Sequence, residues 1–117
     1  MRLTVEIMLR GNNHVFTETI VHPTEPAAWT PEDVAAILKA MLRATAKAQD
    51  PSAPPPADVQ LRGMNWIVHP AADGGMVIAL EIHSASAVAG PVPMAAATLE
   101  GLIGRAVAAD TRPGLVH

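Results

Sequence analysis

The N-terminal residues alternate between apolar and polar side chains. Over residues 2–10, one set of positions is Leu3, Val5, Ile7 and Leu9, and the other is Arg2, Thr4, Glu6, Met8 and Arg10. Successive side chains of a strand point to opposite faces, so this pattern predicts a half-buried β-strand. A turn-forming Gly11-Asn12-Asn13 and a β-branched run over 15–21 follow. Together they predict an antiparallel hairpin, which Pro23 and Pro26 end.

A helical period begins near residue 30. Thr30 can cap free backbone N–H groups, Pro31 suits the first helical position, and Glu32 and Asp33 suit the positive end of the helix dipole. The apolar stripe that follows is Val34, Ile37, Leu38, Met41 and Leu42, and it lies opposite Lys39, Arg43 and Lys47. This arrangement predicts a helix that packs on a sheet and turns its basic side to water.

The second half of the chain repeats the order strand, strand, helix. Residues 59–69 are predicted as a third strand with Gly63 at a bulge, and residues 76–83 as a fourth, nearly all-apolar strand inside the sheet. A Gly-rich turn at 70–75 joins these two strands. A second helix is predicted over 94–109, where Leu99, Leu102, Ile103, Ala106 and Val107 share one face.

The predicted fold is α+β in the order ββαββα, a two-layer sandwich with both helices on one face of a four-stranded, mostly antiparallel sheet. Internal duplication is possible, because 16–31 and 78–93 are equally long stretches that run from a strand through a Pro-containing loop to a helix start. We expect a single domain over 1–117. It comprises unit one (1–49), a Pro-rich crossover (50–58), unit two (59–110) and a loose tail (111–117).

Composition narrows the function classes. Half of the residues are hydrophobic but only 3% are aromatic, so aliphatic side chains and alanine must fill the core. The absence of cysteine excludes disulfides and thiolate metal sites, and we expect a cytoplasmic protein. A net charge of −3 disfavours nucleic-acid binding, and the sequence contains no apolar run long enough to predict a membrane span or a signal peptide.

The sheet face that the helices leave open is the best functional lead. On this face we expect Thr4, Glu6, Met8 and Arg10 from strand one, Gln60, Arg62, Met64 and Trp66 from strand three, and Glu81 and His83 from strand four. A mixture of Trp, Met and Arg is typical of protein interfaces. We therefore predict an interface made of Met8, Arg10, Arg62, Met64 and Trp66. In the alternative, Trp66 folds back under the Pro-rich crossover and completes the core.

Glu81 and His83 are the only candidates for catalysis. They lie two positions apart in a predicted strand, so a carboxylate could orient an imidazole for proton transfer. Ser84 and Ser86 would point to the opposite face from His83, and no Gly-x-Ser-x-Gly turn is present. A surface pair without catalytic duty is the simpler interpretation. The five histidines lack metal-ligand spacing, so neither a metal nor a cofactor is predicted.

The sequence thus favours a small non-catalytic interaction or structural protein. It would form an oligomer with itself, most simply a dimer, or dock onto a larger protein assembly through the open sheet face. The alternative is a small-ligand-binding protein or an acid-base enzyme with Glu81 and His83 at its site. A deep, partly apolar pocket around this pair would favour the alternative.

Overall fold

A computed structural model describes residues 1–54, 56 and 58–111. Its elements are β1 (Arg2–Leu9), β2 (Val15–Val21), the short 3₁₀ helix η1 (Pro26–Ala28), α1 (Pro31–Gln49), β3 (Asn65–Pro70), β4 (Met76–Ile82), β5 (Ala85–Val92) and α2 (Ala96–Thr111). The strands form one sheet in the order β2-β1-β5-β4-β3, and all neighbours are antiparallel. The α+β class and the two helices are therefore confirmed. No helix in the described part of the chain is long and apolar enough to cross a membrane.

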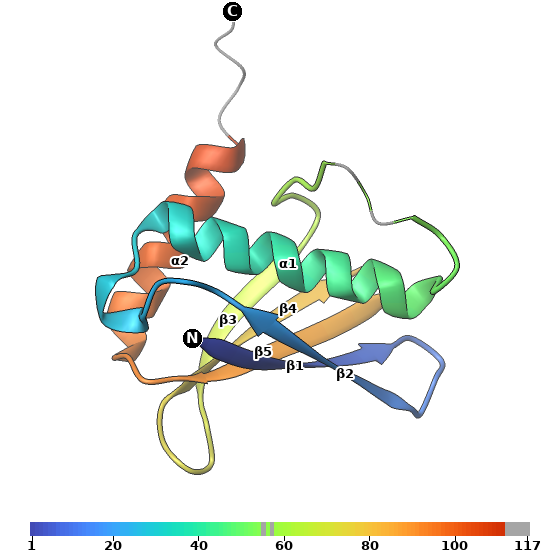
Figure 1. Cartoon of the computed structure of the whole chain (residues 1–117), viewed down its shortest axis with the longest axis horizontal. Coiled ribbons are helices and arrows are strands. Elements are labelled where there is room, and N and C mark those ends of the chain that lie inside the picture. Colours follow the sequence, from blue (N-terminus) through green and yellow to red (C-terminus); the bar gives the residue numbers. More distant parts are fainter. Residues whose placement is uncertain (55, 57, 112–117) are drawn as a thin grey trace, which may run out of the picture.

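Both helices pack on the same face of the sheet, with α1 lying across the strands and α2 beside it (Figure 1). The core between the layers is aliphatic, as its composition requires. It contains Leu3, Val5 and Ile7 of β1, Ile78 and Leu80 of β4, and the predicted stripes of the two helices, in which Leu42 and Val107 are half-buried. The opposite face of the sheet carries no helix.

The start of α1 follows the sequence prediction closely. The Thr30 side chain accepts a hydrogen bond from the Asp33 N–H, and the Asp33 carboxylate accepts one from the Thr30 N–H, which completes a capping box. Two of the free N–H groups at the helix start are thereby satisfied. The prediction of a helix start at this position is confirmed.

The sheet has five strands instead of the four that were predicted. The missing strand is β5, whose sequence of alanines with Gly90 and Pro91 has low strand propensity. Its position explains that composition. The side chains of Ala85, Ala87 and Ala89 are buried on the helix-covered face, where α1 crosses close to β5. Small side chains are required there because a larger one would hold the helix off the sheet.

The predicted internal duplication is not supported. The segment 16–31 runs from β2 through η1 to α1, whereas 78–93 contains most of β4 and all of β5. The second half of the chain therefore has the order βββα, and the first half has ββα. The equal lengths of the two stretches do not correspond to equal structures.

The third strand is shorter than predicted and begins at Asn65. Gly63 lies in a bend with φ of +67°, a left-handed backbone conformation, so it is not a bulge inside a continuous strand. The bend changes the alternation of side chains. Leu61 before it and Trp66 after it both pack against the core, although they are an odd number of positions apart.

The crossover carries the chain from the end of α1 to β3 at the far edge of the sheet. Asp110 of α2 anchors its last part, because its carboxylate accepts a hydrogen bond from the Leu61 N–H at 2.6 Å and lies 3.1 Å from Lys39 Nζ of α1. The Leu61 N–H, with Lys39, lowers the pKa of the Asp110 carboxyl below its ordinary value. Pro55 and Ala57 of the predicted crossover, and 112–117 of the predicted tail, lie outside the described residues; Thr111 ends α2.

Candidate functional site: the open face of the sheet

The open face is built from alternate residues of all five strands. Strand pairing arranges them in rows across the sheet. One row is Val15, Met8, Ser86, Glu81 and Asn65, and the next is Thr17, Glu6, Val88, Ala79 and Ile67. Further along lie Thr19, Thr4, Val77 and His69, and then Val21 beside Arg2. The face is therefore a mixture of apolar, hydroxyl and charged side chains.

The exposed large apolar side chains of the described residues all lie on this face. They are Met8 (52% exposed), Val15 (44%), Val21 (69%) and Ile67 (58%). Half-buried Val77 and Ala79 of β4 adjoin Ile67, and half-buried Val88 of β5 lies beside Ala79. Single exposed apolar residues are common on proteins, but their restriction to one face is informative.

A shallow hollow lies at the β3 side of this face. It has a volume of about 320 Å³, and its lining includes Ile67, Ala79, Glu81, Ser86 and Val88. Ala79 and Ser86 have small side chains between bulkier neighbours, which accounts for the depression. A partner could place an apolar side chain in this hollow.

The predicted interface residues do not all lie on the open face. Met8 does, and Arg10 follows β1 in the turn at one end of the sheet. Arg62 is exposed in the segment before β3. Met64 and Trp66, by contrast, are half-buried and pack against the core on the helix-covered side, so their predicted place on the open face is wrong.

The physical reason for this correction is the bend at Gly63. It gives β3 the opposite alternation to the one predicted, so that Asn65, Ile67 and His69 face outward while Trp66 and Val68 face the core. The alternative in which Trp66 contributes to the core agrees with this arrangement. The assignment of Arg10, Arg62, Met64 and Trp66 to an interface stays a prediction.

The predicted catalytic pair lies at one end of the sheet. Glu81 is exposed on β4, and His83 is exposed in the two-residue turn between β4 and β5. Both line an open depression of about 480 Å³, together with Arg10, Met64 and Asn65. The structure thus brings Arg10, Met64, Glu81 and His83 together. The depression is broad and mostly polar, unlike the deep, partly apolar pocket that an acid-base site requires.

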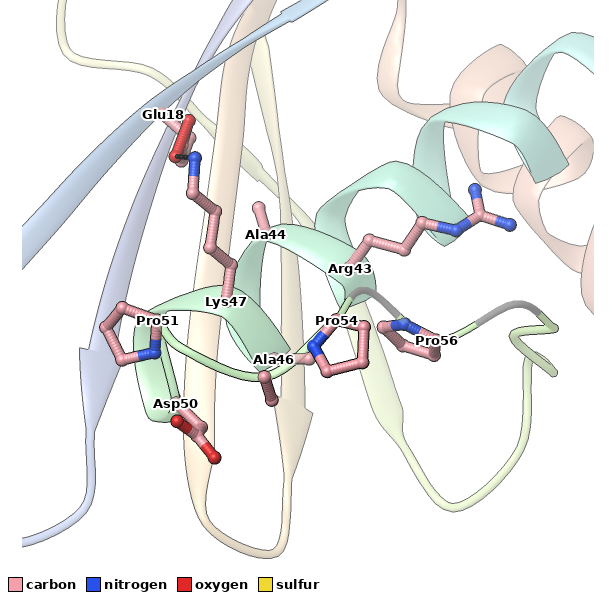
Figure 2. Close-up of a pocket in the computed structure, with 10 residues that line it drawn as sticks. Glu18, Arg43, Ala44, Ala46, Lys47, Asp50, Pro51, Pro54 and Pro56 are labelled. Carbon is pink, nitrogen blue, oxygen red and sulfur yellow. Dashed lines mark hydrogen bonds and ion pairs between the residues drawn. The ribbon is translucent and has the colours of Figure 1, made fainter.

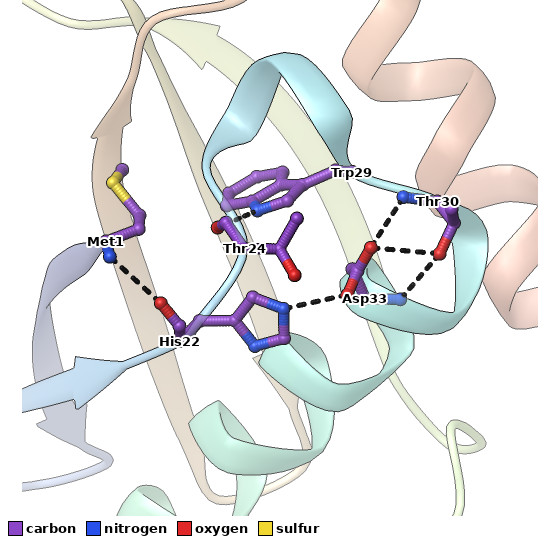
Figure 3. A network of polar contacts seen from close by, with 6 residues as sticks. All are labelled: Met1, His22, Thr24, Trp29, Thr30 and Asp33. Atoms are coloured by element: carbon purple, nitrogen blue, oxygen red, sulfur yellow. Dashed lines mark hydrogen bonds and ion pairs between the residues drawn. The ribbon is translucent and has the colours of Figure 1, made fainter.

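A second histidine and carboxylate make the closest such contact among the described residues, but their role is structural. His22 Nε2 donates a hydrogen bond to Asp33 Oδ1 at 2.9 Å, and Asp33 also accepts hydrogen bonds from Thr30 (Figure 3). The Trp29 ring stands edge-on to the His22 ring, and its indole N–H donates to the Thr24 carbonyl. This cluster holds the end of β2 against the start of α1.

The surroundings of Asp33 stabilise its charged form. The Thr30 backbone N–H contributes most and the His22 side chain next, and together they lower the pKa of Asp33 from 3.8 to about 2. A hydrogen-bonded carboxylate at a helix start is expected to behave in this way. The hydrogen bonds of Asp33 to Thr30 and His22 thus cap the start of α1 and join it to the end of β2 (Figure 3).

A cavity of about 390 Å³ lies between β2, the end of α1 and the crossover (Figure 2). Its lining includes Glu18, Arg43, Lys47, Asp50 and Pro54. Lys47 Nζ lies 3.1 Å from Glu18 Oε1, so this ion pair joins α1 to the edge strand β2. We assign this cavity no ligand.

Sequence reasoning missed Val15, Val21 and Ile67 as members of the open face. For β2 the signal was available, because Val15, Thr17, Thr19 and Val21 alternate with Phe16, Glu18 and Ile20. For Ile67 it was not, since its orientation depends on the bend at Gly63. Among the described residues, no group of three or more His, Asp or Glu side chains is placed to hold a metal ion.

Comparison with known proteins gives no relative. No protein-family model, curated protein or solved structure matches the chain.

Proposed function

We propose that this protein is a non-catalytic interaction protein that docks another protein on its open sheet face. The observation that carries the proposal is the gathering of Met8, Val15, Val21 and Ile67 on that one face. Exposed apolar side chains interspersed with polar ones over one open face are typical of a docking surface. A side chain of the partner could fill the hollow beside Ile67.

The size of the face is compatible with this role. Strands of seven residues at about 3.4 Å per residue, five abreast at about 4.8 Å, span on the order of 600 Å² in projection. Side-chain relief increases the accessible area further. A standard interface buries roughly 800 Å² on each partner.

The charges favour a partner of a different sequence. Glu6 lies near the middle of the face beside Val88, and Glu81 lies one row away, whereas Arg2 lies at the end. Two copies stacked face to face would bring like charges together near the middle, which is unfavourable. We therefore infer a partner that presents apolar side chains flanked by Lys or Arg. Met64 and Trp66 lie on the helix-covered side. The open face therefore lacks two of the side chains on which the sequence prediction of a face-to-face dimer depended.

Affinity capture from the native cell, followed by mass spectrometry, tests the proposal. The bait is compared in three forms: wild type, Ile67→Lys and Ala36→Lys. Ala36 is exposed on α1, so this control adds the same charge away from the open face. A partner recovered with wild type and Ala36→Lys but lost with Ile67→Lys supports the proposal. Equal recovery with all three baits contradicts it.

One observation favours a second candidate function. Arg10, Glu81 and His83 line the same depression, which could hold a small polar ligand or support proton transfer. Glu81 and His83 are both exposed, and among the described residues no side-chain hydrogen bond orients either one. This candidate is therefore less well supported than docking.

A further inference from the structure

Among the described residues, the edge strand β2 has a strand neighbour on one side only, so the backbone groups on its other side have no partner in the sheet. His22 N–H donates to the Met1 carbonyl at 2.8 Å, and the Met1 ammonium donates to the His22 carbonyl at 2.9 Å, so these residues form a hydrogen-bonded pair. Such pairs alternate along an antiparallel ladder. The register then assigns the β1-facing backbone groups to Phe16, Glu18 and Ile20. The N–H and C=O groups of Val15, Thr17, Thr19 and Val21 consequently point away from the sheet.

The other neighbour of β1 gives the same assignment. The Arg10 N–H donates to the Ser84 carbonyl at 2.9 Å, which continues the β1–β5 ladder by one pair. Alternation from this pair directs the backbone N–H and C=O groups of Met8, Glu6 and Thr4 toward β5. The backbone N–H and C=O groups of the odd-numbered residues of β1 therefore point toward β2, in agreement with the hydrogen bonds between Met1 and His22.

This edge lacks the features that usually prevent strand addition. Natural edge strands are protected by lysines, prolines, bulges or short length. β2 has seven residues, of which five are β-branched, and it contains no proline, no lysine and one charge. That charge, Glu18, is engaged by Lys47. The opposite edge, β3, is shorter and ends at Pro70.

The side chains of β2 are self-complementary in the antiparallel sense. Residues 15, 17, 19 and 21, whose backbone groups point away from the sheet, are Val, Thr, Thr and Val. This order is the same in both chain directions. A second copy centred on Glu18 would place Val15 opposite Val21 and Thr17 opposite Thr19, pairs that are favourable across strands. On the covered face it would place half-buried Phe16 opposite half-buried Ile20, so that each shields the other.

The central pair in this register is Glu18 with its own copy. Two carboxylates side by side would repel, but each Glu18 already has Lys47 at 3.1 Å. Two copies therefore bring together two carboxylates and two ammonium groups, which form a neutral, alternating cluster. The ion pair that joins α1 to β2 thus offsets the repulsion between the two carboxylates, and the pairing itself rests on the backbone hydrogen bonds and the apolar and hydroxyl pairs.

We propose that two copies of this chain pair antiparallel through their β2 edges, centred on Glu18, so that two five-stranded sheets become one continuous sheet. The symmetry axis is perpendicular to the sheet, because opposite residues of paired strands share a face. The two open faces therefore lie on the same side. The dimer would present one doubled docking surface, and its formation does not depend on the partner proposed for that surface.

Sedimentation velocity tests the pairing. Thr17→Pro removes an outward N–H, so each dimer loses two inter-copy hydrogen bonds while the β1 ladder stays intact. Thr17→Val keeps the backbone donor and is the matched control. We expect dimers of wild type and Thr17→Val, and dimerisation at least about tenfold weaker for Thr17→Pro. A monomeric wild type overturns the proposal, as does a dimer that Ile67→Lys abolishes and Thr17→Pro does not.

Single-cysteine crosslinking tests the register and does not depend on the folding of the proline variant. The chain has no cysteine, so Glu18→Cys and Thr19→Cys each introduce a single thiol. At the axis, the Cα atoms of two copies of residue 18 would lie about 4.5 Å apart, within disulfide range. The Cα atoms of two copies of residue 19 would be offset by two positions along the strands and would lie more than about 7 Å apart, beyond disulfide range. We expect a disulfide dimer from Glu18→Cys only. A crosslink from Thr19→Cys alone, or from neither, overturns the proposal.

Discussion

His22 Nε2 lies 2.9 Å from Asp33 Oδ1, and this hydrogen bond fixes the end of β2 to the first turn of α1. The same carboxylate caps the helix start through Thr30. One charged group therefore stabilises both a helix terminus and a contact between the two layers. Its protonation should loosen both.

The charged Asp33 predicts how the free energy of unfolding changes at acid pH. The pKa of Asp33 is lowered from 3.8 to about 2, so the charged carboxylate favours the folded state. The stabilisation is fully present above pH 3.8 and is lost as the pH falls toward 2. We expect the wild type to lose stability more steeply than Asp33→Asn over this range in urea unfolding. Asp73→Asn, in the exposed turn before β4, is the control and should retain the wild-type slope.

A substitution in the buried stripe of α1 tests the layer packing. Leu38 is fully buried, and Leu38→Asp would place an unpaired carboxylate in the core. Such burial costs several kcal/mol against a total stability of about 5–15 kcal/mol, so we expect unfolding. The control is Ala36→Asp, because Lys39 pairs with Asp110 and is unsuitable. Equal losses of circular dichroism signal in both variants would mean that α1 packs by a different face.

Two glycines should respond in opposite directions to alanine. Gly63 has a φ of +67° with open space around it, so Gly63→Ala should cost about 1–2 kcal/mol of backbone strain alone. Gly104 lies inside α2, also with open space, and Gly104→Ala should stabilise by about 0.5–1 kcal/mol. Denaturant melts measure both. If Gly63→Ala were neutral, the bend that orients Trp66 would not require a left-handed residue.

The bend at Gly63 also marks the limit of sequence reasoning for the site. Alternation within a strand is local, and it correctly separated the two faces of β1. Alternation carried across Gly63 placed Trp66 on the wrong face, because one left-handed residue changes the direction of the following side chains. Nothing in the flanking residues distinguishes a bulge from a turn at that point.

The missed strand has a tertiary cause. β5 contains small residues because α1 crosses it closely, and that contact exists only in the folded protein. The two hairpins, the cap of α1 and the buried stripes depend on neighbours in sequence and were predictable. The contacts of His22 with Asp33 and of Lys39 with Asp110 join separate elements, and no sequence spacing indicates them.

Substitution of Glu81 and His83 distinguishes a docking protein from an acid-base enzyme. If the protein acts by docking, Glu81→Gln and His83→Ala should each retain partner capture and any activity of the captured complex. General acid-base catalysis would instead lose roughly a hundredfold or more in either variant. Circular dichroism of both variants confirms that folding is intact, so a large loss would favour the second candidate function.

Site-specific photocrosslinking in the native cell tests docking on the open face most directly. A photoreactive amino acid is introduced at Ile67 in one variant and at Ala36 on the solvent side of α1 in another. The docking account predicts a discrete adduct with a protein of different sequence from position 67, and none from position 36. An adduct from position 36 with none from position 67 would contradict it.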